Sequence, residues 1–508
     1  MTTAQICIMI AIVIYLAVVL LVGVAYSKKT KNVGDFYLGG RKLGPLVTAM
    51  SAEASDMSSW LLMGLPGVAY LSGIADAGWT AIGLAVGTYF NWLIIAKKLR
   101  NYSAHIGAIT VPDYFSLRYK DKSRILMAIA ALVIIIFFVP YTASGFAACG
   151  KLFGTLFGID YHIAMIVSAI VIVGYTSLGG FNAASTTDLI QSIVMTIALV
   201  IVLIFGVTKA GGINAVIDNA QSLSGYLNMF TTHNTETGGA DNYSALTIAS
   251  TFAWGLGYFG MPHILLRFMA IEDPNKIKTS RRVASVWVVI SMAIAIFIGV
   301  VGIGMVNNSA LAPLDDSETI IIQIANLLSQ NGIVPALIAG VILAGILAST
   351  MSTADSQLLA ASSSASENII GGLFKAKLSE TAKMIVARLT LIVISVIGVV
   401  LAWDSNSSVF GIVSFAWAGF GAAFGPVVLL SLFWKRSNKY GAIFGMIAGG
   451  AMVFIWKYAI AKLGGAFAIY ELLPAFIFGL IVNIVVSLIT SKPEQSIIDD
   501  FEAVKKIK

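Results

Sequence analysis

Long apolar runs separated by short polar segments recur along the whole chain. A helix that crosses a bilayer needs about 20 apolar residues. Thirteen runs approach or exceed that length, near residues 5–27, 45–71, 77–96, 125–156, 161–179, 183–208, 246–268, 282–306, 333–368, 384–403, 408–434, 440–461 and 467–491. The pattern therefore predicts an all-α polytopic membrane protein with thirteen transmembrane helices.

Basic residues gather in alternate loops between these runs. They lie in segments 28–42, 97–124, 276–282, 375–383, 435–439 and 505–508. Among the intervening loops, 209–245 holds only Lys209 as a base, and the next is acidic, with Asp315, Asp316 and Glu318. Because basic loops stay in the cytoplasm, we expect the N-terminus outside the cell and the C-terminus inside.

Composition supports a membrane protein and argues against several other classes. Of the 508 residues, 58% are hydrophobic and 11% are charged, whereas a soluble domain carries about 25% charge. The net charge of +7 is spread over short loops, so nucleic acid is not an expected partner. Cys7 and Cys149 form no disulfide or zinc pattern. The scattered histidines and the lack of a nucleophile–base or phosphate-binding motif argue against an enzyme.

The second run contains a polar stretch that a plain transmembrane helix would not tolerate. Residues 51–60 read Ser-Ala-Glu-Ala-Ser-Asp-Met-Ser-Ser-Trp. Each carboxylate near the bilayer centre costs roughly 3 kcal/mol, and Gly64, Pro66 and Gly67 weaken the helix beyond it. A broken helix with free carbonyls beside hydroxyls can bind a small cation. The alternative is a packed helix whose serines bond to neighbouring helices.

The seventh run is interrupted as well. Its residues 253–263 read Ala-Trp-Gly-Leu-Gly-Tyr-Phe-Gly-Met-Pro-His, and glycine and proline both disfavour a regular helix. The second and seventh runs are five apart, an odd number, so they cross the bilayer in opposite directions. This favours two inverted repeats of five helices with a binding site at the midplane. A glycine-rich packing face is the alternative.

A stripe of hydroxyls marks the ninth run. Ser349, Ser352, Thr353 and Ser356 share one helical face, and hydroxyl and carbonyl oxygens suit a hard monovalent ion. Hydrogen bonding between helices would produce the same stripe. Three acids complete the candidate chemistry. Asp355 lies beside the stripe, Asp188 is either functional or wetted by the cytoplasm, and Glu53 has no evident partner.

Two segments between the runs are predicted to form helices outside the membrane core. Residues 111–120 are amphipathic and indicate a cytoplasmic interfacial helix. Residues 317–328 indicate a similar helix on the outer side. The tail after about residue 491 is too short for a signalling domain, which disfavours a solute sensor.

Three motifs resemble the sodium:solute symporter family, and within it the bacterial proline branch. They are residues 55–67, residues 254–264 with 267–270, and residues 351–359. The resemblance implies thirteen spans, with an extra first helix before a leucine-transporter-like core of two inverted five-helix repeats. It also implies sodium-coupled uptake of L-proline by alternating access in the cell membrane of a bacterium. Another solute, such as pantothenate, a betaine or a sugar, is the nearest alternative; a solute sensor or a passive channel is the more distant one.

The resemblance also implies residue roles. The main sodium site would use the carbonyls of Ala54, Met57 and Ser349 and the hydroxyls of Ser352 and Thr353. The proline site would fall near Ser55, Ser58, Trp60, Tyr141, Trp254, Tyr258 and Pro262. Asp56 matches a carboxylate linked to sodium dependence, and Arg41 a basic residue linked to coupling. Asp188 matches the acid of a second sodium site, where Asp355 replaces the usual hydroxyl. Whether Ser352, Asp355, Ser356 and Asp188 bind another sodium, a proton or only each other stays open.

The expected division of the chain follows from the same resemblance. Residues 1–44 form the extra helix and a cytoplasmic loop, and 45–208 form the first repeat, with core helices 1–5. Residues 209–245 form an extracellular loop, and 246–434 form the second repeat, with core helices 6–10. Two further helices occupy 435–491, and residues 492–508 form a cytoplasmic tail.

Overall fold

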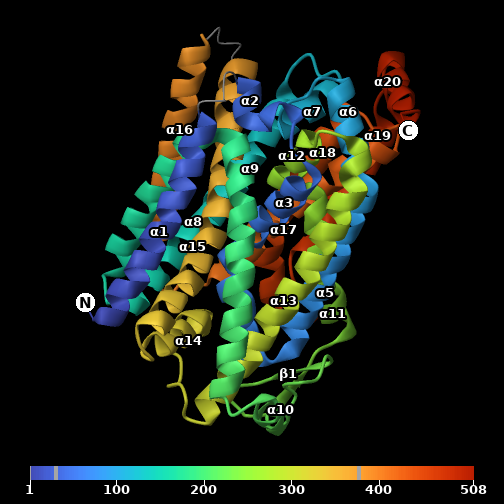
Figure 1. Ribbon diagram of the computed structural model, residues 1–508. Coiled ribbons are helices and arrows are strands. Elements are labelled where there is room, and N and C mark those ends of the chain that lie inside the picture. The colour runs from blue at the N-terminus through green and yellow to red at the C-terminus, as the bar shows by residue number, and fades with distance from the viewer. Residues whose placement is uncertain (1, 28–32, 374–378, 508) are drawn as a thin grey trace.

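A bundle of long helices makes up almost the whole protein (Figure 1). The computed structural model describes residues 2–27, 33–373 and 379–507. Helices α2, α6, α7 and α20 lie at one end of the bundle, and α10, β1 and α14 lie at the other. The predicted basic segments 28–42 and 375–383 fall partly outside the described residues.

The first half of the chain is helical from its start, with short 3-10 or π turns labelled η. Its elements are α1 (Thr3–Ser27), α2 (Val33–Leu38), η1 (Gly39–Arg41), α3 (Pro45–Ser59), η2 (Trp60–Gly64), α4 (Leu65–Ser72), α5 (Ile74–Phe90), η3 (Asn91–Ile95), α6 (Ala96–His105), α7 (Val111–Arg118), α8 (Ile125–Phe157), α9 (Tyr161–Lys209) and α10 (Ile213–Ser222). A small hairpin follows, in which β1 (Thr231–His233) pairs antiparallel with β2 (Ala240–Asn242).

The second half repeats the pattern of long helices joined by short connections. Its elements are α11 (Ala245–Phe252), η4 (Ala253–Gly260), α12 (Pro262–Ala270), η5 (Pro274–Lys276), α13 (Ile277–Asn307), η6 (Ser317–Thr319), α14 (Ile320–Ser329), α15 (Ile333–Ser363), η7 (Ser364–Leu373), α16 (Glu380–Leu401), α17 (Val409–Phe433), α18 (Lys439–Ile455), η8 (Trp456–Ile460), η9 (Ala461–Leu463), η10 (Gly465–Phe467), α19 (Leu472–Ile489) and α20 (Gln495–Lys505).

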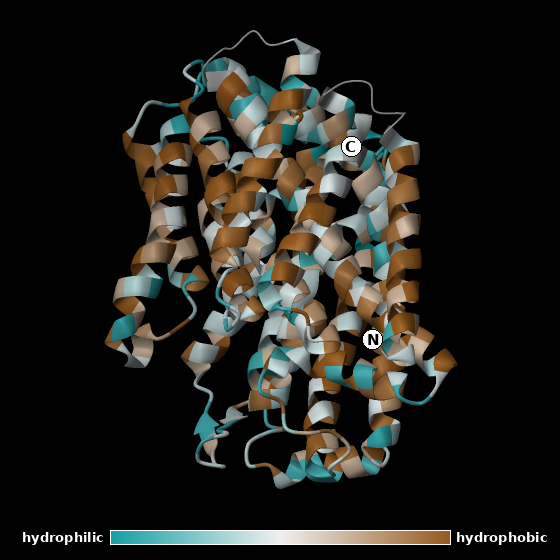
Figure 2. Ribbon diagram, turned by 90° about the vertical axis from the view of Figure 1, so that its left-hand side faces the viewer, coloured by the Kyte–Doolittle hydropathy of each residue, from teal (hydrophilic) through white to brown (hydrophobic). Residues whose placement is uncertain are grey.

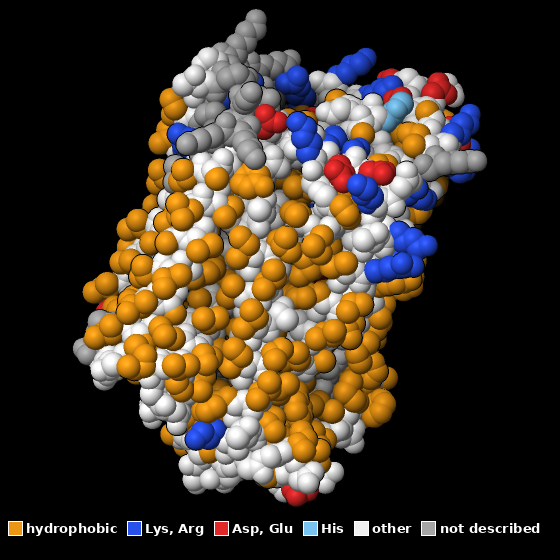
Figure 3. Space-filling model, viewed as in Figure 1, with side chains coloured by type: hydrophobic (Ala, Val, Ile, Leu, Met, Phe, Trp, Pro, Cys, Tyr) orange, Lys and Arg blue, Asp and Glu red, His pale blue; other side chains and the backbone are white. Residues whose placement is uncertain are grey.

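The bundle has the surface of a membrane protein. Within the described residues, 10 helices are long and apolar enough to cross a bilayer, and Tyr161–Gly174 is a shorter apolar helix. Apolar side chains cover the lateral surface, while Lys and Arg gather at the end that holds α20 (Figures 2 and 3). This distribution matches a lipid-facing belt between two polar ends, so the protein is a multi-pass membrane protein.

The first predicted interruption is a sharp break in the chain. Ser58 has φ 48° and ψ −169°, a conformation that L-residues rarely adopt. The helix α3 therefore ends its regular course at Ser58, and η2 and α4 continue the crossing in a new helical register. The segment is buried on all sides from Thr48 to Gly67, so its polar groups face protein rather than lipid.

The second interruption is a run of tight 3-10 turns, η4, instead of an α-helix. Its glycines permit close contact with neighbouring helices, since a Cβ on Gly257 would meet the indole of Trp417, and one on Gly255 would meet the backbone of Gly83. The predicted interruption is therefore present, and its glycines also form a packing face.

A third break lies at the boundary predicted between the fifth and sixth runs. The runs 161–179 and 183–208 join in the single element α9, which is interrupted at Gly180 with φ 65° and ψ −172°. A Cβ at this position would meet the ring of Phe36 in α2. Glycine is required here both by its backbone conformation and by this contact.

The two helices predicted between the runs are both present. Residues 317–328 form η6 and most of α14. Of residues 111–120, Val111–Arg118 form α7, but the prediction that this helix lies on the membrane surface was wrong. Tyr114, Phe115 and Arg118 are buried, because the Tyr114 hydroxyl pairs with Ser431 and the Arg118 guanidinium donates to the Ser431 carbonyl.

Candidate ion and substrate site

The hydroxyl stripe of α15 faces the break in α3. The Ser352 Oγ lies 2.8 Å from the carbonyl oxygen of Ala54 and 3.1 Å from that of Ser349. The Thr353 Oγ1 lies 3.1 Å from the same Ser349 carbonyl. Four of the five predicted sodium ligands are therefore gathered at one place, with two carbonyl and two hydroxyl oxygens. Such a donor set suits a hard monovalent cation.

Met57 is the fifth predicted ligand, and it lies in the last turn before the break. Its side chain is buried, and its carbonyl accepts from the Trp60 N–H across the distorted turn. No hydrogen bond in the described part of the chain joins it to α15. The structure thus places Met57 beside the group without linking it to the hydroxyls.

Asp56 ties the break to two other elements. Its Oδ2 accepts a hydrogen bond of 2.7 Å from the Tyr258 hydroxyl in η4, and its carbonyl accepts one of 2.9 Å from the Tyr141 hydroxyl in α8. The Asn91 amide holds η4 in turn by donating to the Tyr258 carbonyl. The buried Asp56 Oδ1 has no hydrogen-bond partner among the described residues, so an acceptor remains available at the break.

Aromatic rings lie against the same break. The Trp60 and Trp254 ring centroids are 5.8 Å apart, and Phe410 lies against both, at 6.1 Å and 5.5 Å. Tyr470 stacks on Trp254 with centroids 5.0 Å apart and an interplanar angle of 21°. The Trp417 indole donates to the Trp254 carbonyl over 2.8 Å. These rings form one buried apolar surface beside the polar group.

Sequence reasoning missed Phe410, Trp417 and Tyr470. Phe410 and Trp417 lie in α17, which reads as an ordinary apolar span. Tyr470 lies in the connection before α19, outside any motif. Nothing in the local sequence marks these rings as different from the many other aromatic residues of the chain, so only the tertiary structure identifies them.

The remaining predicted substrate residues occupy different positions around the break. The Ser58 Oγ accepts from the Trp60 N–H, and the Ser55 Oγ donates to the Ala52 carbonyl. Pro262 is buried at the start of α12, just after η4. Ser58 thus lies within the break, whereas the Ser55 hydroxyl is engaged by its own helix.

Asp188 does not face the cytoplasm; it lies in a buried charged network. The Arg267 Nη2 is 3.1 Å from the Asp188 Oδ2 and 2.6 Å from the Ser356 Oγ. The Ser51 Oγ donates to the same Asp188 oxygen and accepts from the Arg267 Nε. The Asp355 Oδ1 lies 3.0 Å from the Ser356 Oγ. The guanidinium therefore pairs with Asp188 directly and is linked to Asp355 through the Ser356 hydroxyl.

Glu53 and Arg41 also receive partners from the structure. The Glu53 Oε1 accepts from the Trp92 indole over 3.0 Å, a contact that spacing in the sequence could not reveal. Arg41 lies at the basic end of the bundle, away from the ion ligands. Its guanidinium donates to the carbonyls of Met269, Ser103 and Ala108 and so joins η1 to α12 and α6.

Comparison with known proteins agrees with this architecture. The high-affinity proline transporter PutP of Bacillus subtilis is 42% identical over 484 residues, covering 95% of this chain and 98% of the relative. The osmoregulated proline transporter OpuE of the same organism is 40% identical, and the sodium/proline symporter of Haemophilus influenzae is 41% identical. These two cover 98% of this chain, and 98% and 97% of the respective relatives.

Solved structures share the fold at low sequence identity. A Na+-coupled sialic acid symporter in a substrate-bound outward-open state matches with a TM-score of 0.77 at 21% identity, over 96% of this chain and 99% of its own. A nucleobase-cation-symport-1 family transporter in a closed conformation matches with a TM-score of 0.53 at 15% identity, over 94% and 96%. The sodium:solute symporter family itself matches residues 36–449. The chain therefore belongs to the sodium:solute symporter family.

Proposed function

We propose that this transporter carries L-proline into a bacterial cell together with sodium, by alternating access. Three relatives that match over almost the full chain are named as proline transporters or sodium/proline symporters. The observation that carries the proposal is the contact of the Ser352 hydroxyl in α15 with the Ala54 carbonyl in α3, next to a break bordered by aromatic rings.

Sodium would bind between α3 and α15. Its ligands would be the carbonyls of Ala54, Met57 and Ser349 and the hydroxyls of Ser352 and Thr353. In the structure these hydroxyls donate to carbonyls of the same group, and a bound cation would compete for those oxygens. A sodium ion that contacts both helices binds more tightly when α3 and α15 are close together. This difference in affinity shifts the conformational equilibrium toward that arrangement.

Proline would bind on the outer side of the ion, next to the break. Its carboxylate suits the positive end of the helix dipole where the helix resumes after Ser58. Its apolar ring suits the aromatic surface of Trp60, Trp254, Phe410 and Tyr470. Tyr141 and Tyr258 bond to Asp56 and would link α8 and η4 to the occupancy of this site. The border of the site would include Ser55, Ser58 and Pro262.

The sodium gradient is sufficient to drive such uptake. A membrane potential of 100 mV contributes about 2.3 kcal/mol per charge, and a tenfold sodium ratio adds about 1.4 kcal/mol. One ion per proline would therefore support roughly 500-fold accumulation. A second cation bound near Asp188, Asp355 and Ser356 would double the driving free energy and so square this accumulation ratio. Two carboxyl groups and one guanidinium leave at most one negative charge there, which a single proton or sodium would balance.

We extend the proposal to the topology. The chain crosses the bilayer thirteen times, with the N-terminus outside and the C-terminus in the cytoplasm. Residues 1–44 form an extra helix and loop, 45–208 and 246–434 form inverted repeats of five helices, and 209–245 form an extracellular loop. Two helices in 435–491 and a tail of 492–508 complete the chain. Support comes from the presence of one break in each proposed repeat, at the end of α3 and in η4, and from the gathering of bases at one end.

Uptake into proteoliposomes tests the proposed function. Purified protein is reconstituted, and labelled proline is supplied with an inward sodium gradient or with the same gradient of choline. We expect accumulation above the external concentration only with sodium, and its loss after a sodium ionophore. Unlabelled proline should compete, whereas pantothenate, glycine betaine and glucose should not. Accumulation without sodium, or competition by one of the other solutes alone, would overturn the assignment.

A further inference from the structure

A groove at the basic end of the bundle lies apart from the ion and substrate site. It has a volume of about 490 Å³ and lies between α6, the end of α17 and the C-terminal helix α20. Its basic lining residues are Lys97, Lys98 and Lys505, and no acidic residue is among the described residues that line it. The groove therefore offers positive charge without a built-in counter-ion.

The Lys97 Nζ donates to the Asn275 Oδ1 over 3.0 Å, whereas no ion pair engages Lys98 or Lys505 among the described residues. The Lys98 ammonium lies 3.8 Å from the centre of the Phe433 ring, and Lys505 is near enough to Lys98 for the two cations to repel each other. Two acids of α20, Asp500 and Glu502, pair with Lys120 at 2.9 Å and with Lys435 at 3.9 Å. Two like charges kept together beside an aromatic ring favour an anion between them.

Two buried polar groups next to the groove lack partners. Tyr102 lines the groove and is 2% exposed, and its hydroxyl has no hydrogen-bond partner within the described residues. Behind it, the Arg118 guanidinium lies 5.1 Å from the Tyr102 ring and 5.3 Å from the Phe501 ring. The two terminal nitrogens of Arg118 are buried and likewise unpaired in that part of the chain. An unpaired buried donor is costly, so these groups indicate a missing acceptor.

The groove continues into the lipid-facing surface of the protein. Leu93, Phe433 and Ile507 line it and are 43%, 43% and 46% exposed. A soluble anion would use the lysines but leave these apolar side chains in water. A phospholipid supplies a phosphate for the lysines and acyl chains for the apolar edge, and basic pockets beside transmembrane helices bind such headgroups.

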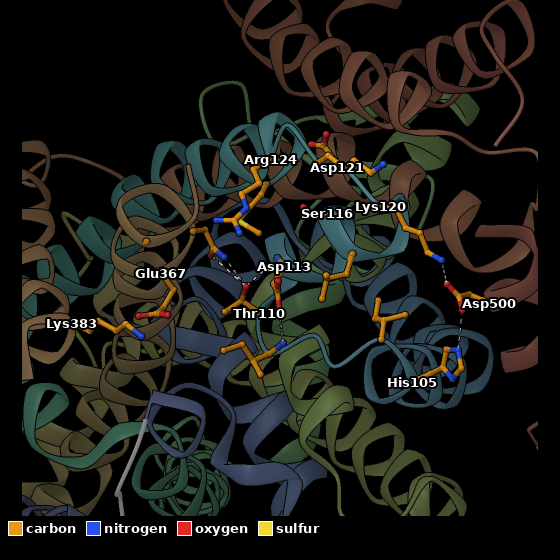
Figure 4. Close-up of a pocket in the computed structure, with 17 residues that line it drawn as sticks. His105, Thr110, Asp113, Ser116, Lys120, Asp121, Arg124, Glu367, Lys383 and Asp500 are labelled. Carbon is orange, nitrogen blue, oxygen red and sulfur yellow. Dashed lines mark hydrogen bonds and ion pairs between the residues drawn. The ribbon is translucent and has the colours of Figure 1, made fainter. Parts of the chain in front are cut away.

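A second, larger cavity nearby differs from the groove in the charges of its lining. It has a volume of about 720 Å³ and includes Asp113, Asp121, Glu367 and Asp500 together with several bases (Figure 4). Its mixed charges give no preference for an anion. Of these two cavities, judged by the described residues that line them, the groove is the one that combines uncompensated bases, an unpaired donor and an apolar edge.

We propose that the groove between α6, α17 and α20 binds an anionic phospholipid of the leaflet at the basic end of the protein. The headgroup phosphate lies at Lys98 and Lys505, within reach of the Tyr102 hydroxyl, and the acyl chains follow Leu93 and Phe433. The bound lipid joins the C-terminal helix to α6 and α17. Under the proposed topology this is the cytoplasmic leaflet.

Native mass spectrometry of the full-length protein tests the site with phosphatidylglycerol as the probe. The variant Lys98→Gln/Lys505→Gln removes two charges from the groove. The control Lys278→Gln/Lys506→Gln removes two exposed charges from the same end but outside the groove. We expect about 25-fold weaker lipid retention in the groove variant, from a factor of about five per lysine, and less than a threefold change in the control. Equal loss in both variants would overturn the proposal.

Further experiments distinguish a phospholipid site from a site for a soluble anion, and loss of the site from misfolding of the variant. Inorganic phosphate at 50 mM, roughly physiological ionic strength, should not displace the lipid, and phosphatidylcholine should be retained less than phosphatidylglycerol. Displacement by phosphate, or equal retention of the two lipids, would contradict a phospholipid site. Tyr102→Phe keeps the ring against Arg118 and removes only the hydroxyl, so it should fold normally and still retain severalfold less lipid. Unchanged retention in this variant would also count against the proposal.

Discussion

The hydroxyl of Ser352 in α15 lies 2.8 Å from the carbonyl oxygen of Ala54 in α3. These residues are 298 positions apart in the chain, and the contact joins a hydroxyl stripe to a broken helix. A carbonyl freed from its own helix and a hydroxyl from another helix form a site that neither element has alone. The sodium hypothesis depends on this pairing.

Removing both hydroxyls of the ion site should weaken sodium activation. In Ser352→Ala/Thr353→Ala we expect the sodium concentration for half-maximal proline uptake to rise at least tenfold, since about 1 kcal/mol is lost with each ligand. Ser362→Ala/Ser363→Ala is the matched control, because those hydroxyls lie further along α15 and bond to its own backbone. The same sodium requirement in both variants would remove the site assignment.

The aromatic surface should determine proline affinity. Tyr470→Ala and Trp254→Ala each remove one ring of a stacked pair, so we expect the half-saturating proline concentration to rise about threefold to tenfold. Tyr470→Phe loses the hydrogen bond to the Ser414 carbonyl but keeps the ring, and it should stay close to the wild type. If the alanine variants also bind proline normally, the substrate lies elsewhere.

The buried Arg267–Asp188 pair should act as a unit. Arg267→Met leaves the Asp188 carboxylate buried without its cation, and we expect a loss of about 3–5 kcal/mol in unfolding free energy. Arg267→Met/Asp188→Leu should lose less than the single variant, because no charge is left unpaired. Thermal unfolding in detergent measures both. A double variant as unstable as the sum of its single variants would show that the two groups do not interact.

The Asp500 carboxylate should hold the C-terminal helix in place above acidic pH. Burial raises its pKa, but the hydrogen bonds from Lys120 and His105 outweigh this effect and hold the pKa below its ordinary value. A lowered pKa means that the stabilisation is present above about pH 4 and is lost as the pH falls through the lowered value.

Hydrogen exchange of residues 495–505 checks this pH dependence. Exchange in the wild type should be constant from pH 8 to pH 5 after correction for intrinsic rates, about the range above the ordinary Asp pKa. Asp500→Asn should weaken docking by at most about 1 kcal/mol, since the pair is partly exposed to solvent. Docking in Asp500→Asn that equals the wild type at pH 7 would show that the ion pairs contribute nothing.

The sequence predicted the membrane class and both breaks because these follow from local composition. Carboxylates at 53 and 56 and glycines at 255, 257 and 260 are anomalous in apolar runs whatever surrounds them. The hydroxyl spacing of α15 could likewise be read from helical periodicity. The expectation that Ser352 and Ala54 lie close together came from the family resemblance, not from the spacing.

Other parts of the site could not be predicted because they depend on tertiary structure. Trp92 lies in the π turn η3 and donates a hydrogen bond to Glu53. Tyr470 lies in the connection before α19 and stacks on Trp254. The position of α7 was wrong because its amphipathic pattern suits a membrane surface and a buried interface equally. The environment of Asp188 depended on Arg267, which is 79 residues away in the chain.

In the proposed mechanism, sodium and proline bind at adjoining parts of one broken helix. Equilibrium binding of labelled proline to the purified protein, with and without 100 mM sodium, tests this most directly, because linkage requires each ligand to strengthen the other. We predict that removing sodium weakens proline binding at least tenfold in the wild type but changes it less than twofold in Ser352→Ala/Thr353→Ala. Proline binding that ignores sodium in the wild type, or that keeps its full sodium dependence in this variant, would contradict the account.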